Sequence, residues 1–208
     1  MTKSINVTFP DSSSKIFKSG ISCLEIVKSI SNSLAKKVLV ASFNDKLVDI
    51  STKLDSDGSI KFYTWDDDEG KSTFWHSSAH LLAESVESIY PGVKFGIGPP
   101  ISNGFYYDID FVDYDISEIN LSKIEKKFIE LSKNNVDFKR SEVSKKYALD
   151  FFKKKGESYK LELIKDLQDG EISFYEQGNF IDLCKGPHIP TSNHIKSVKI
   201  LNVAGAYW

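Results

Sequence analysis

Hydrophobic and polar positions alternate at the start of the chain and predict a strand. Ile5, Val7 and Phe9 alternate with polar residues and are followed by Pro10-Asp11, which is typical of a half-buried strand that ends in a turn. The same kind of pattern predicts further strands at 15–18, 38–43, 46–50 and 59–63. The middle two are expected to form a hairpin around Asn44-Asp45.

One helix is predicted between these strands. Ser22 precedes Glu25 by three positions, the spacing of a capping box, in which each side chain accepts from a free amide of the first turn. An apolar stripe follows at Leu24, Ile26, Val27 and Ile30, and Cys23 is assigned to this helix core. The order strand, strand, helix, strands favours a small β-grasp unit, and the pattern leaves other small α+β modules open.

An acidic run follows and predicts a connector. Asp66-Asp67-Asp68-Glu69-Gly70 places four like charges beside a glycine, a poor interior for a regular element. We therefore expect two domains, 1–65 and 66–208.

The second region shows helical and hairpin patterns in alternation. Helices are predicted at 72–90, 121–131 and 143–155, and Gly156 is placed to cap the last of these. Asn103-Gly104 predicts a hairpin turn with a returning strand at 105–109, and 171–175 with 179–183 predict a second hairpin. The fold class expected for the whole chain is α+β.

Composition and charge limit the functions that this chain can have. Of its 208 residues, 40% are hydrophobic and 27% charged, with 27 basic against 29 acidic residues. This composition excludes a disordered chain and a polybasic nucleic-acid binder that works by bulk charge. Arg140 is the single arginine, so phosphate contacts would come from lysines. Lys123, Lys126, Lys127 and the run Lys153–Lys155 are candidates, although exposed helical lysines usually only interact with solvent.

The cysteines point to a reducing compartment, and the shortness of the apolar runs points to a soluble protein. Cys23 and Cys184 are the only two cysteines, too few and too far apart for a disulfide framework. The N-terminus lacks the apolar core of a signal peptide, and no apolar run approaches the ~20 residues that cross a bilayer. We expect a soluble, cytoplasmic protein without a membrane partner.

Three of the four histidines fall into two short motifs that could carry chemistry. His76 and His80 are four positions apart, which places them on one helix face. Cys184 and His188 follow the second predicted hairpin, with Asp182 two residues earlier.

These residues allow three interpretations. They could be structural; they could bind zinc through three nitrogens and one sulfur; or they could form a metal-free hydrolytic pocket in which imidazole moves a proton off water. Ser77 stands where a zincin protease needs its glutamate, which excludes that class. Spacing alone does not separate zinc from metal-free hydrolysis.

Five ordered motifs resemble the threonyl-tRNA synthetase family of bacteria. They are His76-Ser-Ser-Ala-His80-Leu-Leu, Gly96-Ile-Gly-Pro-Pro with Asn103-Gly-Phe-Tyr-Tyr-Asp108, Gly156-Glu-Ser-Tyr-Lys160, Asp182-Leu-Cys-Lys-Gly-Pro-His188 and Ala204-Gly-Ala-Tyr-Trp208. The resemblance implies a TGS domain of β-grasp fold in residues 1–65. It implies an editing domain, shared with alanyl-tRNA synthetases, in residues 66–208.

The resemblance implies that the second domain hydrolyses the ester of seryl-tRNA(Thr), the mischarged product. His76 and Cys184 would position the attacking water, and His76 or Lys160 would move its proton. Lys160 would also stabilise the leaving 3′-oxygen, and His80 and His188 would complete the pocket.

The same resemblance implies three substrate-binding residues. Asp182 would hold the serine ammonium or hydroxyl group. Gly98 would offer backbone contacts to the ligand, and Tyr107 would bind the aminoacyl or adenosine part.

The resemblance also sets expectations about cofactors and partners. A related editing domain holds zinc with a similar set, so zinc at His76, His80, Cys184 and His188 is an option, but we favour a metal-free reaction with no required cofactor. ATP, the catalytic zinc and threonine activation belong to a synthetase domain that we do not find here. The partner is the acceptor end of tRNA(Thr) carrying serine. The full enzyme is expected to be a homodimer and this fragment a monomer. A non-catalytic tRNA-docking module and a structural zinc domain remain alternatives.

Overall fold

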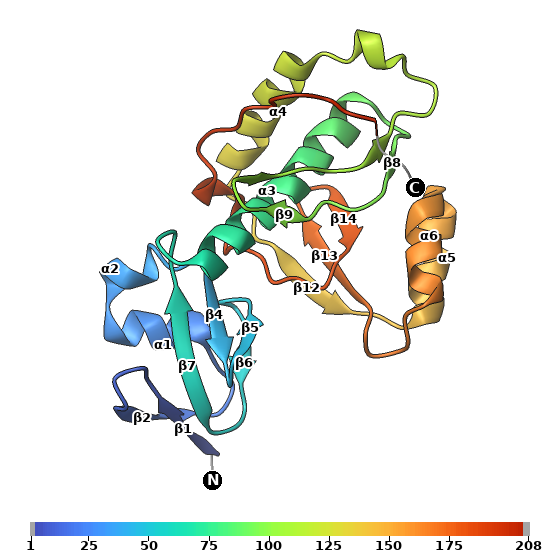
Figure 1. Ribbon diagram of the computed structural model, residues 1–208. Coiled ribbons are helices and arrows are strands. Elements are labelled where there is room, and N and C mark those ends of the chain that lie inside the picture. The colour runs from blue at the N-terminus through green and yellow to red at the C-terminus, as the bar shows by residue number, and fades with distance from the viewer. Residues whose placement is uncertain (1–2, 206–208) are drawn as a thin grey trace. The chain divides into compact units, whose positions relative to one another are not determined.

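The computed structural model describes residues 3–205 (Figure 1). Contacts within the chain divide it into two units, Met1–Phe74 with Gly186–Pro190, and Trp75–Lys185 with Thr191–Trp208. The domain boundary expected at residues 65 and 66 stays a prediction, and Ala206–Trp208 of the terminal motif lie outside the described residues. Within the described part, no helix has the length and apolarity that a membrane span requires.

The first unit has the architecture of a β-grasp fold. Its five-stranded sheet has the order β2-β1-β7-β4-β5, in which β1 and β7 are parallel and the other pairs antiparallel. The strands are β1 Ser4–Thr8, β2 Ser14–Lys18, β4 Val40–Phe43, β5 Lys46–Val48 and β7 Gly58–Tyr63. Helix α1 (Cys23–Ile30) buries Cys23, Ile26 and Val27 in the same core as residues of these strands.

Two local predictions for this unit are confirmed. The Ser22 side chain accepts from the amide of Glu25, and the Glu25 carboxylate accepts from the amide of Ser22, so the capping box is present. Asn44 and Asp45 both have positive φ, the conformation that a tight hairpin turn between β4 and β5 requires. The short pieces α2 (Asn32–Ala35), β3 (Ile21–Ser22) and β6 (Lys53–Leu54) were not predicted.

The acidic connector is the first correction. Helix α3 runs from Asp68 to Ile89, so the prediction of a connector across 66–70 is wrong from Asp68 onward. Asp68 and Glu69 lie in the first turn, where negative side chains interact favourably with the positive end of the helix dipole. Gly70 allows a close approach, because a Cβ there would lie 1.8 Å from the carbonyl oxygen of Thr64.

In its described residues, the second unit combines four helices with three small sheets. Strand β8 (Lys94–Phe95) pairs with β11 (Ile109–Asp110), and β9 (Pro100–Ile101) pairs with β10 (Gly104–Phe105). Strands β12 (Lys139–Glu142), β13 (Ser173–Gln177) and β14 (Phe180–Leu183) form an antiparallel sheet. Besides α3, the helices are α4 Leu121–Lys133, α5 Lys145–Lys155 and α6 Ser158–Lys165, and single 3₁₀ turns lie at Ile116–Glu118 and Ser192–His194.

Both predicted hairpins of this unit exist, with shifted turns. Gly104 pairs with Ile101, so the first turn is Ser102-Asn103 and not Asn103-Gly104. The predicted strand 105–109 is two strands with different partners, β10 and β11. In the second hairpin Gln177 pairs with Phe180, so its turn is Gly178-Asn179. Gly156 caps α5 with φ of 75°, as predicted.

Two apolar clusters hold the elements of the second unit together. One joins α3, β8, α4 and β14 through Ala83, Phe95, Ile124 and Phe180. The other packs α5 and α6 on the three-stranded sheet, with Phe152 and Ile164 among its buried residues. The first cluster fixes β14 against α3, which brings two of the sequence motifs together.

Candidate functional site

Helix α3 presents two histidines side by side. The rings of His76 and His80 are 5.1 Å apart and inclined by 77°. His80 is 3% exposed and His76 partly buried. The helical spacing predicted from the sequence is therefore present, at the edge of the buried face.

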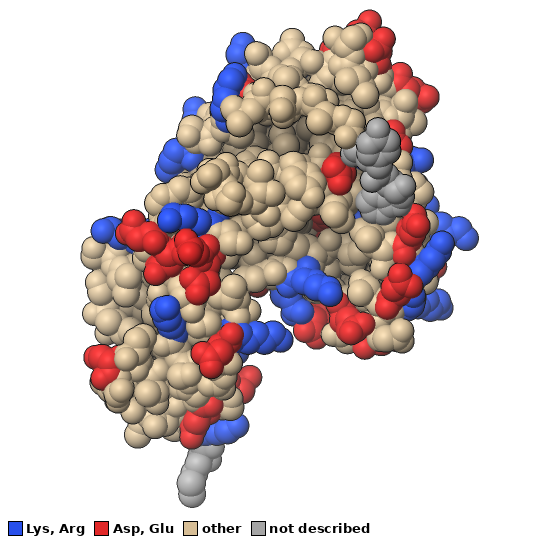
Figure 2. Space-filling model, in the orientation of Figure 1, with Lys and Arg blue, Asp and Glu red and all other residues tan. Residues whose placement is uncertain are grey.

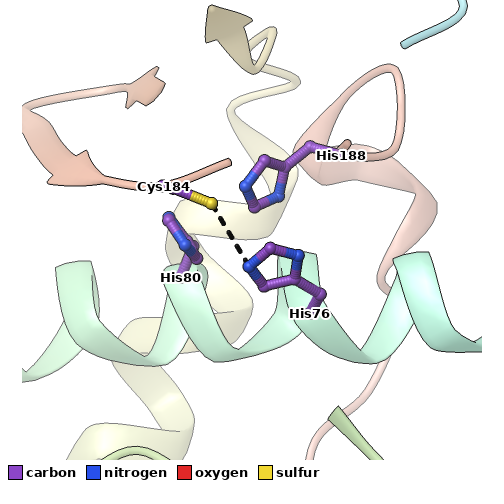
Figure 3. Close-up of side chains that lie close together, drawn as sticks. All are labelled: His76, His80, Cys184 and His188. Carbon is purple, nitrogen blue, oxygen red and sulfur yellow. Dashed lines mark hydrogen bonds between the residues drawn. The ribbon is translucent and has the colours of Figure 1, made fainter. Parts of the chain in front are cut away.

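The β13–β14 hairpin supplies the thiol. Cys184 follows β14, and its amide donates to the carbonyl oxygen of Ser173 at 3.0 Å. The hydroxyl of Ser173 donates to the carbonyl oxygen of Cys184 at 2.6 Å, so both backbone groups of Cys184 are held. The thiol sulfur lies 3.3 Å from Nε2 of His76 (Figure 3).

The four residues of the two motifs converge. Ligand atoms of His76, His80, Cys184 and His188 all lie within 4.8 Å of one another, and their side chains point toward a common centre (Figure 3). The amide of His188 donates to Oδ1 of Asp49 at 2.8 Å. Three imidazole nitrogens and one thiol are a donor set that suits tetrahedral zinc, so these residues fit that metal.

A buried ion pair adjoins the histidines. Nζ of Lys160 lies 2.6 Å from Oδ1 of Asp182, and both side chains are 3% exposed. The hydroxyl of Tyr107 donates to Oδ2 of the same carboxylate. Lys160 also donates to the carbonyl oxygen of Gly96 at 2.8 Å. These contacts bring a lysine, an aspartate and a tyrosine from three separate segments to one place.

The environment sets the charge of each group. Burial alone would raise the pKa of Asp182, but the Lys160 ammonium, the nearby His80 and two hydrogen bonds outweigh it, so that pKa lies below its usual value. Burial lowers the pKa of His80 to about 3, although Asp182 lies 3.8 Å from its Nε2 and opposes this shift. Burial raises the pKa of Tyr107 well above its usual value. At neutral pH the site therefore holds an ionised aspartate, a neutral His80 and a neutral tyrosine that donates.

Gly98 is placed against Tyr107. A Cβ at Gly98 would lie 2.4 Å from the ring carbon Cδ2 of Tyr107, a distance that real side chains do not reach. Gly98 thus lies in direct contact with the tyrosine ring, where any side chain would clash. All eight residues singled out from the sequence lie in or beside this one region.

Sequence reasoning missed three supporting groups. The hydroxyl of Ser173 donates to the backbone carbonyl of Cys184, and the carbonyl oxygen of Gly96 accepts from Lys160. Both bonds involve a backbone carbonyl, so the sequence pattern did not indicate them. Glu157 is 5% exposed and accepts from the amide of Phe95 at 3.0 Å. It lies in the quoted motif Gly156–Lys160, but a glutamate before a helix is too common to be noticed without the fold.

Comparison with known proteins identifies the class of these domains. Residues 5–64 match the TGS domain, and residues 172–205 match the threonyl and alanyl tRNA synthetase second additional domain. The chain is thus a TGS domain followed by an editing-type domain of aminoacyl-tRNA synthetases.

Sequence relatives narrow this class to one family. Proteins described as threonine–tRNA ligase from Cytophaga hutchinsonii, Parabacteroides distasonis and Bacteroides fragilis are 52%, 48% and 47% identical to 98% of this chain. The chain spans about a third of their length, 32%, 31% and 32% respectively. It corresponds to the N-terminal region of threonyl-tRNA synthetases, with the TGS and editing-type domains.

Proposed function

We propose that the second unit hydrolyses the ester of seryl-tRNA(Thr), giving serine and tRNA(Thr). The observation that carries the proposal is the buried ion pair of Asp182 and Lys160 beside His76 and Cys184. Burying an ion pair costs desolvation free energy that a packed apolar pair would avoid. Such a pair next to imidazole and thiol groups is typical of a functional site.

The reaction needs one positioned water. Its oxygen attacks the ester carbonyl carbon, the bond to the ribose oxygen breaks, and the water proton passes to that oxygen through His76. His76 is suited to this transfer because one imidazole nitrogen can accept a proton while the other donates one. Cys184, 3.3 Å from His76, orients the same water. Lys160 stabilises the negative charge that develops on the leaving oxygen.

Asp182 binds the substrate amino group in this proposal. A carboxylate that stays ionised attracts the serine ammonium, and Lys160 and Tyr107 fix its two oxygens. Serine differs from threonine by one methyl group, which changes binding by only ~1–3 kcal/mol in a site that prefers the larger ligand. A second site that rejects the larger ligand by its walls restores selectivity, and Gly98 with the Tyr107 ring is the wall that we assign to this task.

The test compares two substrates. The protein is incubated with seryl-tRNA(Thr) and threonyl-tRNA(Thr), and the remaining ester is followed over time. Fast loss of serine with threonine spared is expected. Equal, slow loss of both esters would instead favour a non-catalytic tRNA-docking module. His76→Ala and Cys184→Ala should abolish hydrolysis without unfolding the protein, as circular dichroism would report.

A zinc site is the second candidate function of the four-residue cluster, because its donor atoms all lie within 4.8 Å of one another. Zinc bound by all four of His76, His80, Cys184 and His188 would have a closed tetrahedral shell and would stabilise the fold. With three of them as ligands, the fourth position would be open for a water that zinc would polarise. We favour the metal-free reaction. Metal analysis of the purified protein and deacylation in the presence of a chelator decide between the two, since loss of activity on chelation contradicts our choice.

A basic groove provides the RNA contact in this proposal. A shallow groove of about 360 Å³ is lined by Ser88, Ile89, Lys123, Lys126, Lys127 and Glu130. Basic side chains gather along α4 on the face drawn in Figure 2. Lys127 pairs with Glu130 at 2.8 Å, which leaves Lys123 and Lys126 as the exposed cations for acceptor-arm phosphates. In the second lysine run, Lys155 pairs with Glu87, so only Lys153 and Lys154 remain there.

A further inference from the structure

Glu157 occupies the position before helix α6 but does not cap that helix. Residues at this position usually accept from amides of the first turn, and the Glu157 side chain makes no such bond. It reaches instead to a segment 62 positions earlier and accepts from the buried amide of Phe95 at 3.0 Å. Its side chain is buried, and burial raises its pKa. A carboxylate is costly in such a place, so the contact with Phe95 needs an explanation beyond helix capping.

Lys160 forms a hydrogen bond with Gly96, the residue that follows Phe95. Three positions after Glu157, one helical turn along α6, its ammonium donates to the carbonyl oxygen of Gly96 at 2.8 Å. The carboxylate thus takes the N–H of Phe95 and the ammonium takes the C=O of Gly96. Two side chains of one helix turn hold two consecutive backbone groups, one donor and one acceptor.

These two hydrogen bonds, from Phe95 to Glu157 and from Lys160 to Gly96, determine where Tyr107 lies. From Gly96 the chain pairs with the returning segment, because the amide of Gly96 donates to Asp108 and that of Asp108 donates to Ile97, both at 2.9 Å. Gly98 then lies against the Tyr107 ring, and the Phe95 ring packs on Tyr107 with centroids 5.5 Å apart. A shift of Phe95 would therefore move both the wall at Gly98 and the tyrosine that binds Asp182.

We propose that Glu157 is a positioning residue that holds the segment from Phe95 to Gly98 against Tyr107 and thereby sets the choice between serine and threonine esters. The inference rests on the proposed deacylation. It assigns selectivity to a side chain that touches neither substrate nor reacting atoms and acts through one backbone hydrogen bond.

The test compares Glu157→Ala with Glu157→Gln. Alanine removes the acceptor and leaves the Phe95 amide buried without it, whereas glutamine keeps an acceptor oxygen and loses only the charge. For Glu157→Ala we expect the ratio of kcat/KM for seryl- over threonyl-tRNA(Thr) to fall roughly tenfold or more, with Glu157→Gln close to the wild-type ratio. Glu162→Ala, an exposed site on the same helix, is the matched control and should keep that ratio.

Amide hydrogen exchange measures the hydrogen bond between the Phe95 amide and Glu157 independently of activity. Exchange at Phe95 should accelerate in Glu157→Ala and stay near the wild-type rate in Glu157→Gln. If the wild-type protein shows no deacylation, the proposed function fails, while the exchange rate at Phe95 still shows whether Glu157 holds this amide. A folded Glu157→Ala that keeps the substrate ratio overturns the inference, and so does a loss of the ratio that is equal in both variants.

Discussion

Lys160 and Asp182 lose nearly all contact with water, and each is the counterion of the other. Removing one partner of such a pair leaves an uncompensated buried ion, which is far more destabilising than replacing both partners. The pair can therefore be tested for stability separately from its proposed part in catalysis.

Substituting Asp182 by asparagine should destabilise the fold by about 3–5 kcal/mol, because the Lys160 ammonium stays buried without its counterion. The double variant Asp182→Asn with Lys160→Met should recover much of this loss. Urea unfolding followed by circular dichroism measures both values, with the exposed Asp150→Asn as control. A change below about 1 kcal/mol in the single variant would contradict this picture.

Glu84 is a second buried carboxylate, one helical turn after His80. Its side chain is buried, accepts from the amide of Asn179 at 3.2 Å and lies against Gly178. Burial raises its pKa, so ionisation of this group opposes folding. The protonated carboxyl favours the folded state. This contribution to the free energy of unfolding is complete below pH 4.5, the pKa of Glu84 in the unfolded chain, and is lost as the pH rises through its higher pKa in the folded protein.

Replacing Glu84 by glutamine should remove the loss of stability that ionisation of Glu84 causes as the pH rises. The free energy of unfolding of Glu84→Gln, relative to that of the wild type, should therefore increase between about pH 4 and pH 7. Urea titrations of both proteins at the two pH values give the difference, in which the other titrating groups cancel. A difference that does not change with pH would show that the Glu84 carboxyl is not perturbed.

At the scale of the element, the capping box of α1 was predictable because all of its information lies within four residues. Ser22 and Glu25 satisfy each other's amides whatever the rest of the chain does. Ser22→Ala should thus cost about 1 kcal/mol of stability, while Ser22→Asp should keep most of it. Thermal unfolding measures the effect, and a destabilisation equal in both variants would mean that the side-chain acceptor is not the cause.

Other elements depend on partners that the local sequence does not reveal. All four residues of β12 are exposed, so it has no hydrophobic alternation, and only its pairing with β13 makes it a strand. The acidic run at 66–70 has the composition of a linker, yet its last residues form the first turn of α3. The hairpin at Ser102-Asn103 slipped by one residue from its prediction because pairing, not the Asn-Gly motif, sets the register.

At the scale of the whole molecule, the sequence spacing predicted two pairs of site residues, His76 with His80 and Cys184 with His188, and the fold brings the two pairs together. His76 and His80 share a helix face by periodicity alone, but Cys184 is 108 positions from His76 and Lys160 comes from a helix that was not predicted. The resemblance to a family, and not the pattern, placed Lys160, Tyr107 and Gly98 in the site. The apolar cluster of α3, β8, α4 and β14, on which Tyr107 also packs, holds the helix of the two histidines against the strand that precedes Cys184.

RNA binding belongs to this scale because it depends on how charge is distributed over the surface. With 27 basic against 29 acidic residues, the chain attracts no polyanion by net charge, so binding has to come from a local cluster such as Lys123 and Lys126 on α4. Each phosphate neutralised in duplex RNA or DNA releases condensed counterions, and the logarithm of the binding constant falls with the logarithm of salt by about 0.9 per contact.

Replacing both Lys123 and Lys126 by alanine should therefore weaken binding of tRNA(Thr) at low salt and reduce the steepness of the salt dependence by about two. Replacing Lys36 and Lys37, which are also exposed, removes the same charge elsewhere and should leave the steepness unchanged. Filter binding across a salt series separates the two variants. If both pairs reduce the slope equally, the lysines of α4 act through net charge alone, and the groove that they line is not the surface that contacts RNA.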